Sequence, residues 1–375
     1  MSANHLAAPP KHVTLDNLTL SRKEGFRERV ESTGRVQPEL LTARQLRALS
    51  EKALRQYNRE RATWHANLPT IKTAQLAALY EDLHVIVASN LQDGDKAKGA
   101  IAIEGPAGVG KSTAILAFSG EFHRVQISDF GRFTENGNER WPVCRVGMTG
   151  NTGMKDFNRA MLAFYNHAGT RRGTAADFAD RALDCMLACE TKLLVVDDLH
   201  FLKQRTTSVE ISNQFKYISN EFPVTIIFLG IGLEQRGLYS DGTYANGILG
   251  QSGRRITPLS LREFEIGSDE HYHEWRRLLL AIEKRIVLTH RRRGMLVDHS
   301  ELLYERSSGR IGPLITLVNR ACQLAMRMGT EFINRDLLES VRMDAASDRQ
   351  RTESRAKVRK ALARRTQNTS RSKSR

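Results

Sequence analysis

Apolar and polar positions along the chain follow two different patterns. From about residue 42 to residue 68, and again from 73 to 90, apolar residues recur at the spacing of an amphipathic helix. Residues 92–99, QDGDKAKG, form a polar break that contains two glycines. After this break, short apolar runs alternate with helical stretches. This alternation is typical of an α/β sheet built from crossover connections.

The apolar runs predict five strands, and the stretches between them predict helices. We expect strands at 100–104, 142–147, 192–198, 224–229 and 255–261, and helices at 111–122, 154–167, 174–190 and 209–221.

A phosphate-binding motif follows the first strand. The segment GPAGVGKS matches G-x-x-x-x-G-K-[ST] in full, after a predicted strand and at the start of a predicted helix. Its glycines let backbone N–H groups point at phosphate oxygens, and the helix N-terminus adds positive potential. Lys111 is expected to reach the β- and γ-phosphates of ATP, and the Ser112 hydroxyl to bind Mg²⁺. The predicted nucleotide-binding residues are Gly105, Pro106, Ala107, Gly108, Val109, Gly110, Lys111, Ser112 and Thr113.

A second acidic strand end completes the expected chemistry. The run KLLVVDD, residues 192–198, is apolar until it ends in two aspartates. We expect Asp197 to hold magnesium through water, and Asp198 to polarise the water that attacks the γ-phosphate. Asp198 stands where many such enzymes carry a glutamate, which is one methylene longer, so we expect slow hydrolysis. The alternative is a solvated strand end.

These segments resemble a known family. Five strands with an extra crossover between the P-loop strand and the aspartate strand resemble an AAA+ ATPase core. The segment LLVVDDLHFL is similar to the Walker B strand of DnaA-like ATPases. The order of helical lead-in, P-loop, this strand, SGRRITPLSLREF and SSGRIGPLITLVNRACQLA resembles the TniB/TnsC family of transposition ATPases, over about residues 60–340.

The resemblance implies a domain organisation. We expect an N-terminal helical extension at 1–70 and an AAA+ α/β nucleotide-binding domain at 71–265, with a parallel five-stranded sheet between helices. A small helical lid at 266–340 and a disordered basic tail at 341–375 would follow.

Several arginines and polar residues are candidates for a catalytic role. Arg254 and Arg255 precede the fifth strand, where AAA+ proteins often place an arginine finger, although a basic surface pair is the alternative. Arg310 is a candidate for the second sensor, or an exposed loop arginine. The fourth strand runs IIFLGIG and shows no evident polar sensor. Thr149 and Asn151 are candidates to restrain the catalytic acid.

Charge changes the picture of the partners. The chain has 57 Lys and Arg against 42 Asp and Glu, a formal net charge of +15. From 342 to 375 there are twelve basic and three acidic residues, and the end of this segment has too few apolar residues to fold alone. It is either a solvated tail or an arm on nucleic acid, and we favour the latter. The sequence shows no signal peptide or apolar run of membrane-spanning length, so we expect a cytoplasmic protein.

The sequence therefore predicts an ATPase with ATP and magnesium as cofactors. The family resemblance implies an ATP-dependent homo-oligomer on double-stranded DNA that selects a target and engages a transposase. A DnaA-like replication initiator or helicase loader, and a nucleotide-switched signalling ATPase, are the alternatives.

Overall fold

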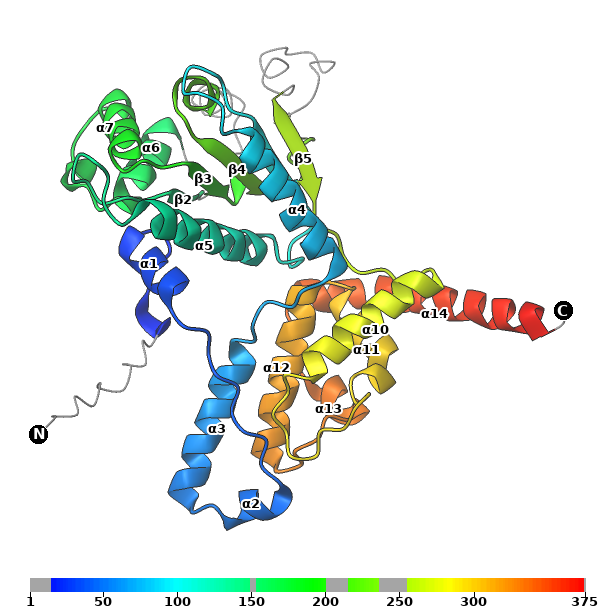
Figure 1. The fold of residues 1–375 in the computed structure, drawn as a ribbon. Helices are drawn as coiled ribbons and strands as arrows, with labels where there is room; N and C mark the ends of the chain where they lie inside the picture. The colour runs from blue at the N-terminus through cyan, green and yellow to red at the C-terminus, as the bar shows by residue number, and fades with distance from the viewer. Residues whose placement is uncertain (1–14, 149–152, 200–214, 236–254, 374–375) are drawn as a thin grey trace, which may run out of the picture. The chain divides into compact units, whose positions relative to one another are not determined.

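The computed structural model describes residues 15–148, 153–199, 215–235 and 255–373. The chain divides into two compact units, each built from three separate segments. The first unit takes the described residues of 1–33, 83–103 and 115–259, and the second takes those of 34–82, 104–114 and 260–375. Figure 1 shows the path of the chain through these elements.

A five-stranded sheet forms the centre of the first unit, in the order β2-β3-β4-β1-β5. β2 and β3 are parallel, as are β3 and β4. β1 and β5 are also parallel, because Ala100 N–H donates to Arg255 O at one end and Leu261 N–H donates to Glu104 O at the other. The predicted α/β core is confirmed, with β4 between the P-loop strand and the aspartate strand. The strands are β1 (Ala100–Glu104), β2 (Val143–Gly147), β3 (Leu193–Asp197), β4 (Thr225–Gly230) and β5 (Ile256–Ser260).

Helices flank this sheet and protect its apolar strands. β3 and β4 are buried along their whole length, as continuous apolar runs in a parallel sheet require. α6 packs against β2 and α7 (Figure 1). The elements are η1 (Leu15–Asn17), α1 (Lys23–Glu31), α5 (Lys111–Phe130), α6 (Met154–Phe164), η2 (Ala168–Thr170) and α7 (Ala175–Ala188), with residues 215–221 also helical.

The N-terminal helix α1 is fixed to the first unit by one aromatic side chain and one carboxylate. Phe26 is fully buried and lies edge-on to Phe164, with ring centroids 6.1 Å apart. Lys23 Nζ donates to Glu139 at 2.7 Å, and Arg27 pairs with the same carboxylate. Burial raises the pKa of Glu139, but hydrogen bonds from Lys23, Trp141 and Arg27 outweigh it and lower the pKa to about 2.

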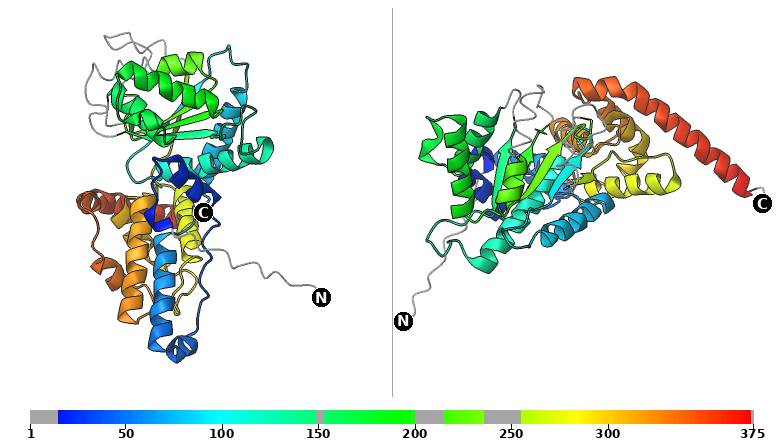
Figure 2. Two further views of the ribbon diagram at one scale, coloured as in Figure 1. Left: turned by 90° about the vertical axis from the view of Figure 1, so that its left-hand side faces the viewer. Right: turned by 90° about the horizontal axis from the view of Figure 1, so that it is seen from above.

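The second unit is built from helices around an apolar core that includes Trp275, Leu279 and Leu317. α3 lies alongside α12, as the left-hand view of Figure 2 shows. No described helix is both long and apolar enough to span a membrane. The elements are α2 (Ala43–Ala48), α3 (Glu51–Ala66), α10 (Asp269–Glu283), η4 (Val297–His299), α11 (Ser300–Ser307), α12 (Ile311–Met328), α13 (Arg335–Ser340) and α14 (Ala345–Lys373), while α4 (Ala74–Ser89) contributes to both units.

A buried ion pair joins α3 to the rest of the second unit. Arg61 Nη1 donates to Glu331 Oε2 at 2.6 Å and Nη2 donates to Oε1 at 2.9 Å, so the pair is bidentate. Both side chains are almost completely buried. Glu331 also accepts the backbone N–H of Thr289 at 3.0 Å. Residues that precede the P-loop in sequence therefore form part of the second unit.

The structure differs from two sequence expectations. The single helical stretch at 42–68 is broken into α2 and α3, because Ser50 accepts the N–H of Ala53 and starts a new helix. The tail, expected to be disordered, forms α14, and its Val358 and Ala361 are buried in the core of the second unit. Ion pairs from Arg351 to Glu339 and from Arg355 to Glu305 support this helix.

The Arg61–Glu331 pair generates a stability prediction. We expect Arg61→Met or Glu331→Leu alone to lower the free energy of unfolding by about 3–5 kcal/mol, because each leaves a buried charge unpaired. The double variant should be destabilised clearly less. Urea unfolding of the three variants measures this. The matched control is Arg55→Met, which removes an exposed pair with Glu51 and should cost about 0–1 kcal/mol. A double variant as unstable as the sum of the two single effects would contradict the prediction.

Candidate nucleotide site

The P-loop has the backbone that its glycines predict. Gly108 has φ +82° and Gly110 has φ +95°, a region that residues with a Cβ rarely adopt. A Cβ on Gly105 would lie 2.1 Å from the carbonyl oxygen of Leu261, so only glycine fits there. Val109 is buried and anchors the loop, whereas Ala107 and Gly108 are exposed. The exposed turn is therefore held by its own buried residue and by the chain after β5.

Lys111 lies over this loop. Its Nζ donates to the carbonyl oxygens of Gly105 at 2.6 Å and Pro106 at 2.9 Å. The side chain is thus curled around the turn that phosphates would enter. Ser112 and Thr113 follow on the exposed first turn of α5.

The start of α12 contacts the P-loop directly. Gly312 N–H donates to the carbonyl oxygen of Gly108 at 2.8 Å. A Cβ on Gly108 would lie 3.0 Å from Pro313 Cδ and 4.0 Å from Arg310 Cβ. Arg310 is the N-cap of α12, and its Nε is buried without a hydrogen-bond partner. The predicted second sensor is therefore beside the phosphate loop, with one buried donor unsatisfied.

The two aspartates end β3 as expected. Asp197 is buried, and its Oδ1 accepts the N–H of Asp198 at 3.0 Å. Asp198 is exposed and has φ +61°, which aspartate tolerates better than most residues. Asp197 Oδ2 accepts from Arg145 Nη2 at 2.6 Å. Sequence reasoning missed Arg145, although one charged residue inside the apolar strand PVCRVG was a signal that a buried acid pairs with it.

Of the remaining candidate residues, only Arg255 lies within the described part of the chain. Arg255 directly precedes β5, and its Nη1 donates to Asn220 Oδ1 at 2.6 Å. Arg254, Thr149 and Asn151 lie outside the described residues. The roles of these residues as finger or restraint stay predictions.

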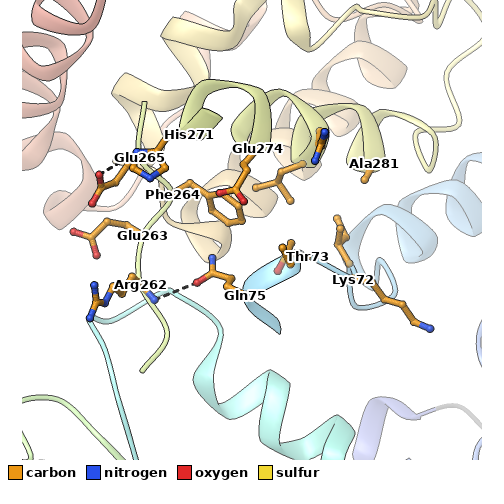
Figure 3. A pocket seen from close by; sticks show the side chains of 14 residues that line it. Lys72, Thr73, Gln75, Arg262, Glu263, Phe264, Glu265, His271, Glu274 and Ala281 are labelled. Atoms are coloured by element: carbon orange, nitrogen blue, oxygen red, sulfur yellow. Dashed lines mark hydrogen bonds and ion pairs between the residues drawn. The ribbon is translucent and has the colours of Figure 1, made fainter. Parts of the chain in front are cut away.

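The second unit contains a cavity of about 330 Å³, lined in part by the residues that follow Leu261 (Figure 3). Arg262 follows Leu261, which touches Gly105, and its N–H donates to Gln75 Oε1 at 3.3 Å. Phe264 N–H donates to the carbonyl oxygen of Gly309, next to Arg310. Ile71, Phe264 and Leu278 supply apolar surface, and charged side chains such as Glu263 and Glu274 line the same space. Size and lining suit a planar heterocycle with polar edges.

A second cavity, of about 540 Å³, lies in the first unit and is basic. Arg22, Arg159 and Arg171 line it, together with Asp156 and the end of β2 at Gly147. All three arginines are exposed, and no ion pair joins them to a described acidic residue. We refer to this space as the arginine cavity. It can take a phosphate group, because guanidinium groups bind phosphate oxygens in bidentate fashion.

The P-loop and aspartate residues fit the ATP and magnesium that the sequence predicts. The positive-φ glycines leave room for phosphate oxygens, and Arg310 keeps a buried donor unsatisfied. No cluster of three or more His, Cys, Asp or Glu suited to a metal occurs among the described residues. Protein sites usually hold magnesium by one or two oxygen ligands together with phosphates and water. Ser112 and Asp197 are the residues that would hold it.

The positive φ of Gly108 in the phosphate loop generates a binding prediction. We expect Gly108→Ala to weaken ATP binding about tenfold or more, because alanine at φ +82° costs about 1–2 kcal/mol and its Cβ would press on Pro313. Calorimetric titration with ATP measures this. Gly137→Ala is the matched control, since Gly137 has φ +78° and nothing within 4 Å of a Cβ. If both variants bind ATP equally well, the loop does not depend on this glycine.

Comparison with solved structures supports the fold. The chain is similar to the Aeropyrum pernix ORC2 protein in ADPNP and ADP complexes, with 14% identity, a TM-score of 0.55, and coverage of 73% of this chain and 69% of that one. The Aeropyrum pernix ORC1 protein in complex with DNA is 14% identical, with a TM-score of 0.53 and coverage of 72% of this chain and 65% of that one. Cdc6p from Pyrobaculum aerophilum is 12% identical, with a TM-score of 0.51 and coverage of 72% of this chain and 67% of that one. The chain spans about two thirds of the length of these structures. At such identities the likeness concerns the fold alone.

Sequence comparison identifies the family. A search of curated protein sequences finds no match. The model of the bacterial TniB protein family matches residues 61–246, a segment that contains the P-loop and both aspartates of β3. This match confirms the resemblance seen in the sequence: over residues 61–246 the chain belongs to the bacterial TniB family, and its fold is shared with the ORC and Cdc6 structures.

Proposed function

We propose that this protein is an ATP-dependent, DNA-binding regulator of transposition. In this role it binds ATP and magnesium, assembles as a homo-oligomer on duplex DNA, selects a target and engages a transposase. The observation that carries the nucleotide part is the P-loop itself, with Gly108 and Gly110 at positive φ and Arg310 beside them. The transposition part rests on the TniB family match.

Each residue of the site has a distinct part in this proposal. Backbone N–H groups of the P-loop and Lys111 bind the phosphates, and Arg310 reaches the γ-phosphate from the start of α12. Magnesium, held by Ser112 and Asp197, would neutralise charge on the β- and γ-phosphates. Asp198 orients the attacking water. The base occupies the cavity at Phe264 and Gln75, where apolar faces can stack and polar edges can pair.

An arginine from a neighbouring copy completes catalysis. Arg254 and Arg255 are the candidates to offset charge on the transferred phosphoryl group, so hydrolysis would depend on assembly. This arrangement couples the oligomer on DNA to the nucleotide state. The ORC2 protein that resembles this chain was solved with ADPNP and ADP, which supports a nucleotide-binding role for the shared fold.

Duplex DNA is the polyanion that we assign to the arginine cavity. No ion pair joins its three arginines to a described acidic residue, and Asp156 is the one acidic residue that lines the cavity. By contrast Arg351, Arg355 and Lys357 on α14 each pair with a carboxylate. The ORC1 protein with a similar fold was solved in complex with DNA, which supports a DNA-binding role for the shared fold.

Two variants test the nucleotide part. We expect Lys111→Ala to abolish ATP binding and ATP-dependent assembly, because the phosphates lose their positive partner. Asp198→Asn should bind ATP normally but hydrolyse it at least tenfold more slowly, and its complexes on DNA should last longer. Calorimetry, phosphate release and dissociation from DNA measure these effects. ATP affinity within a few-fold of wild type in Lys111→Ala would refute the nucleotide site, and unchanged turnover in Asp198→Asn would place the catalytic acid elsewhere.

Salt titration tests the DNA part. We expect Arg159→Ala with Arg171→Ala to weaken binding to random and defined duplexes alike, since phosphate contacts carry no sequence information. The slope of log K against log salt should fall by about 0.9 for each phosphate that the protein no longer neutralises, so by about 1.8 for two arginines. Fluorescence anisotropy at three or more salt concentrations measures the slope.

The controls separate the arginine cavity from the tail. Arg172→Ala removes a neighbouring exposed arginine that does not line the cavity, and it should leave the slope near wild type. A truncation after Arg364 spares Ser354, Val358 and Ala361, which are buried. If this truncation flattens the slope and the double variant does not, DNA contacts the tail and the assignment to the cavity is wrong.

A further inference from the structure

Arg145 is a charged residue at the centre of an otherwise apolar strand. In the parallel register of β2 and β3, Arg145 is opposite Val195 and Gly147 is opposite Asp197. Residues two apart on a strand share a face of the sheet, so Arg145 and Gly147 point to the same side as Val195 and Asp197. The guanidinium therefore reaches diagonally to the carboxylate, with Nη2 2.6 Å from Oδ2.

The carboxylate needs such a partner. Asp197 is only 3% exposed, and the strand residues before it, Leu193 to Val196, are all buried. A buried carboxylate is costly unless it is paired and hydrogen-bonded. Asp197 meets this requirement with Arg145 at one oxygen and the N–H of Asp198 at the other. The Arg145 side chain is itself 20% exposed, so it can leave the pair for solvent.

We propose that Arg145 is a positioning residue that competes with magnesium for Asp197. Without metal, its guanidinium neutralises the carboxylate and holds it in place. When Mg²⁺ approaches, the two cations repel each other, so metal binding and release of Arg145 are coupled. This inference rests on the proposed role of Asp197 in holding magnesium. It makes the affinity for nucleotide with magnesium lower than the same site would have without Arg145.

Two substitutions separate charge from shape. Arg145→Gln keeps a hydrogen-bond donor toward Asp197 but removes the charge, whereas Arg145→Lys keeps the charge. ADP affinity is measured by calorimetry over a range of Mg²⁺ concentrations, so the readout does not depend on hydrolysis. Mg²⁺ should raise the affinity for ADP, and the Mg²⁺ concentration that gives half of this increase is the quantity compared. It should fall about tenfold in Arg145→Gln and stay near wild type in Arg145→Lys.

Thermal unfolding supplies a second measurement. Without metal, Arg145→Gln should unfold at a lower temperature than wild type, because Asp197 loses its counter-charge. Saturating Mg²⁺ and ADP should close this gap. If the variant does not fold without ligand, refolding it with Mg²⁺ and ADP should recover it.

The outcomes separate this inference from the proposed function. Wild-type protein that binds neither ATP nor ADP would refute the proposed function. Wild-type protein that binds nucleotide, with the same Mg²⁺ dependence in wild type and Arg145→Gln, would overturn this inference alone. A stability loss that Mg²⁺ and ADP do not reduce would also overturn it, because Arg145 would then be purely structural.

Discussion

The hydrogen bond from Gly312 N–H to the Gly108 carbonyl is the interaction on which the phosphate site depends. The first N–H groups of a helix have no partner within it, and here the P-loop supplies one for α12. The approach is so close that a Cβ on Gly312 would lie 2.9 Å from Gly108 O. It fixes Arg310, the residue before this turn, beside the phosphate loop. Through this contact residues 104–114 form part of the same compact unit as α12.

Features that depend on neighbouring residues in sequence could be predicted. β1 has the expected bounds, and β2, β3, β4 and β5 differ from expectation by at most one residue at each end. The P-loop was predictable because its motif specifies backbone conformation. Ser50 followed by Glu51 was a readable start signal for α3. The helix formed by the tail could not be predicted, because the tail has few apolar residues. Val358 and Ala361 are buried only by packing against the rest of the second unit.

Pairings between distant residues could not be predicted. Arg145 and Asp197 are 52 positions apart, and their pairing depends on the register of β2 and β3, which the sequence does not fix. The same holds for Arg61 and Glu331, which join α3 to the segment after α12. The arginine cavity gathers residues from before α1, from α6 and from the end of η2. Each of these arginines looks like an ordinary surface residue until the fold brings them together.

Net charge is therefore a poor guide to where a polyanion binds. Many of the 57 basic residues are committed within the fold: Arg61 to Glu331, Arg140 to Glu190, and Arg351 to Glu339. A guanidinium held by a carboxylate must break that pair to contact phosphate, so it releases little net free energy on binding. An arginine without such a partner gives up only hydration and counterions. By this criterion the three arginines of the cavity are candidates for contact with phosphates, together with basic residues of α14 such as Arg359 and Lys360, which pair with no described carboxylate.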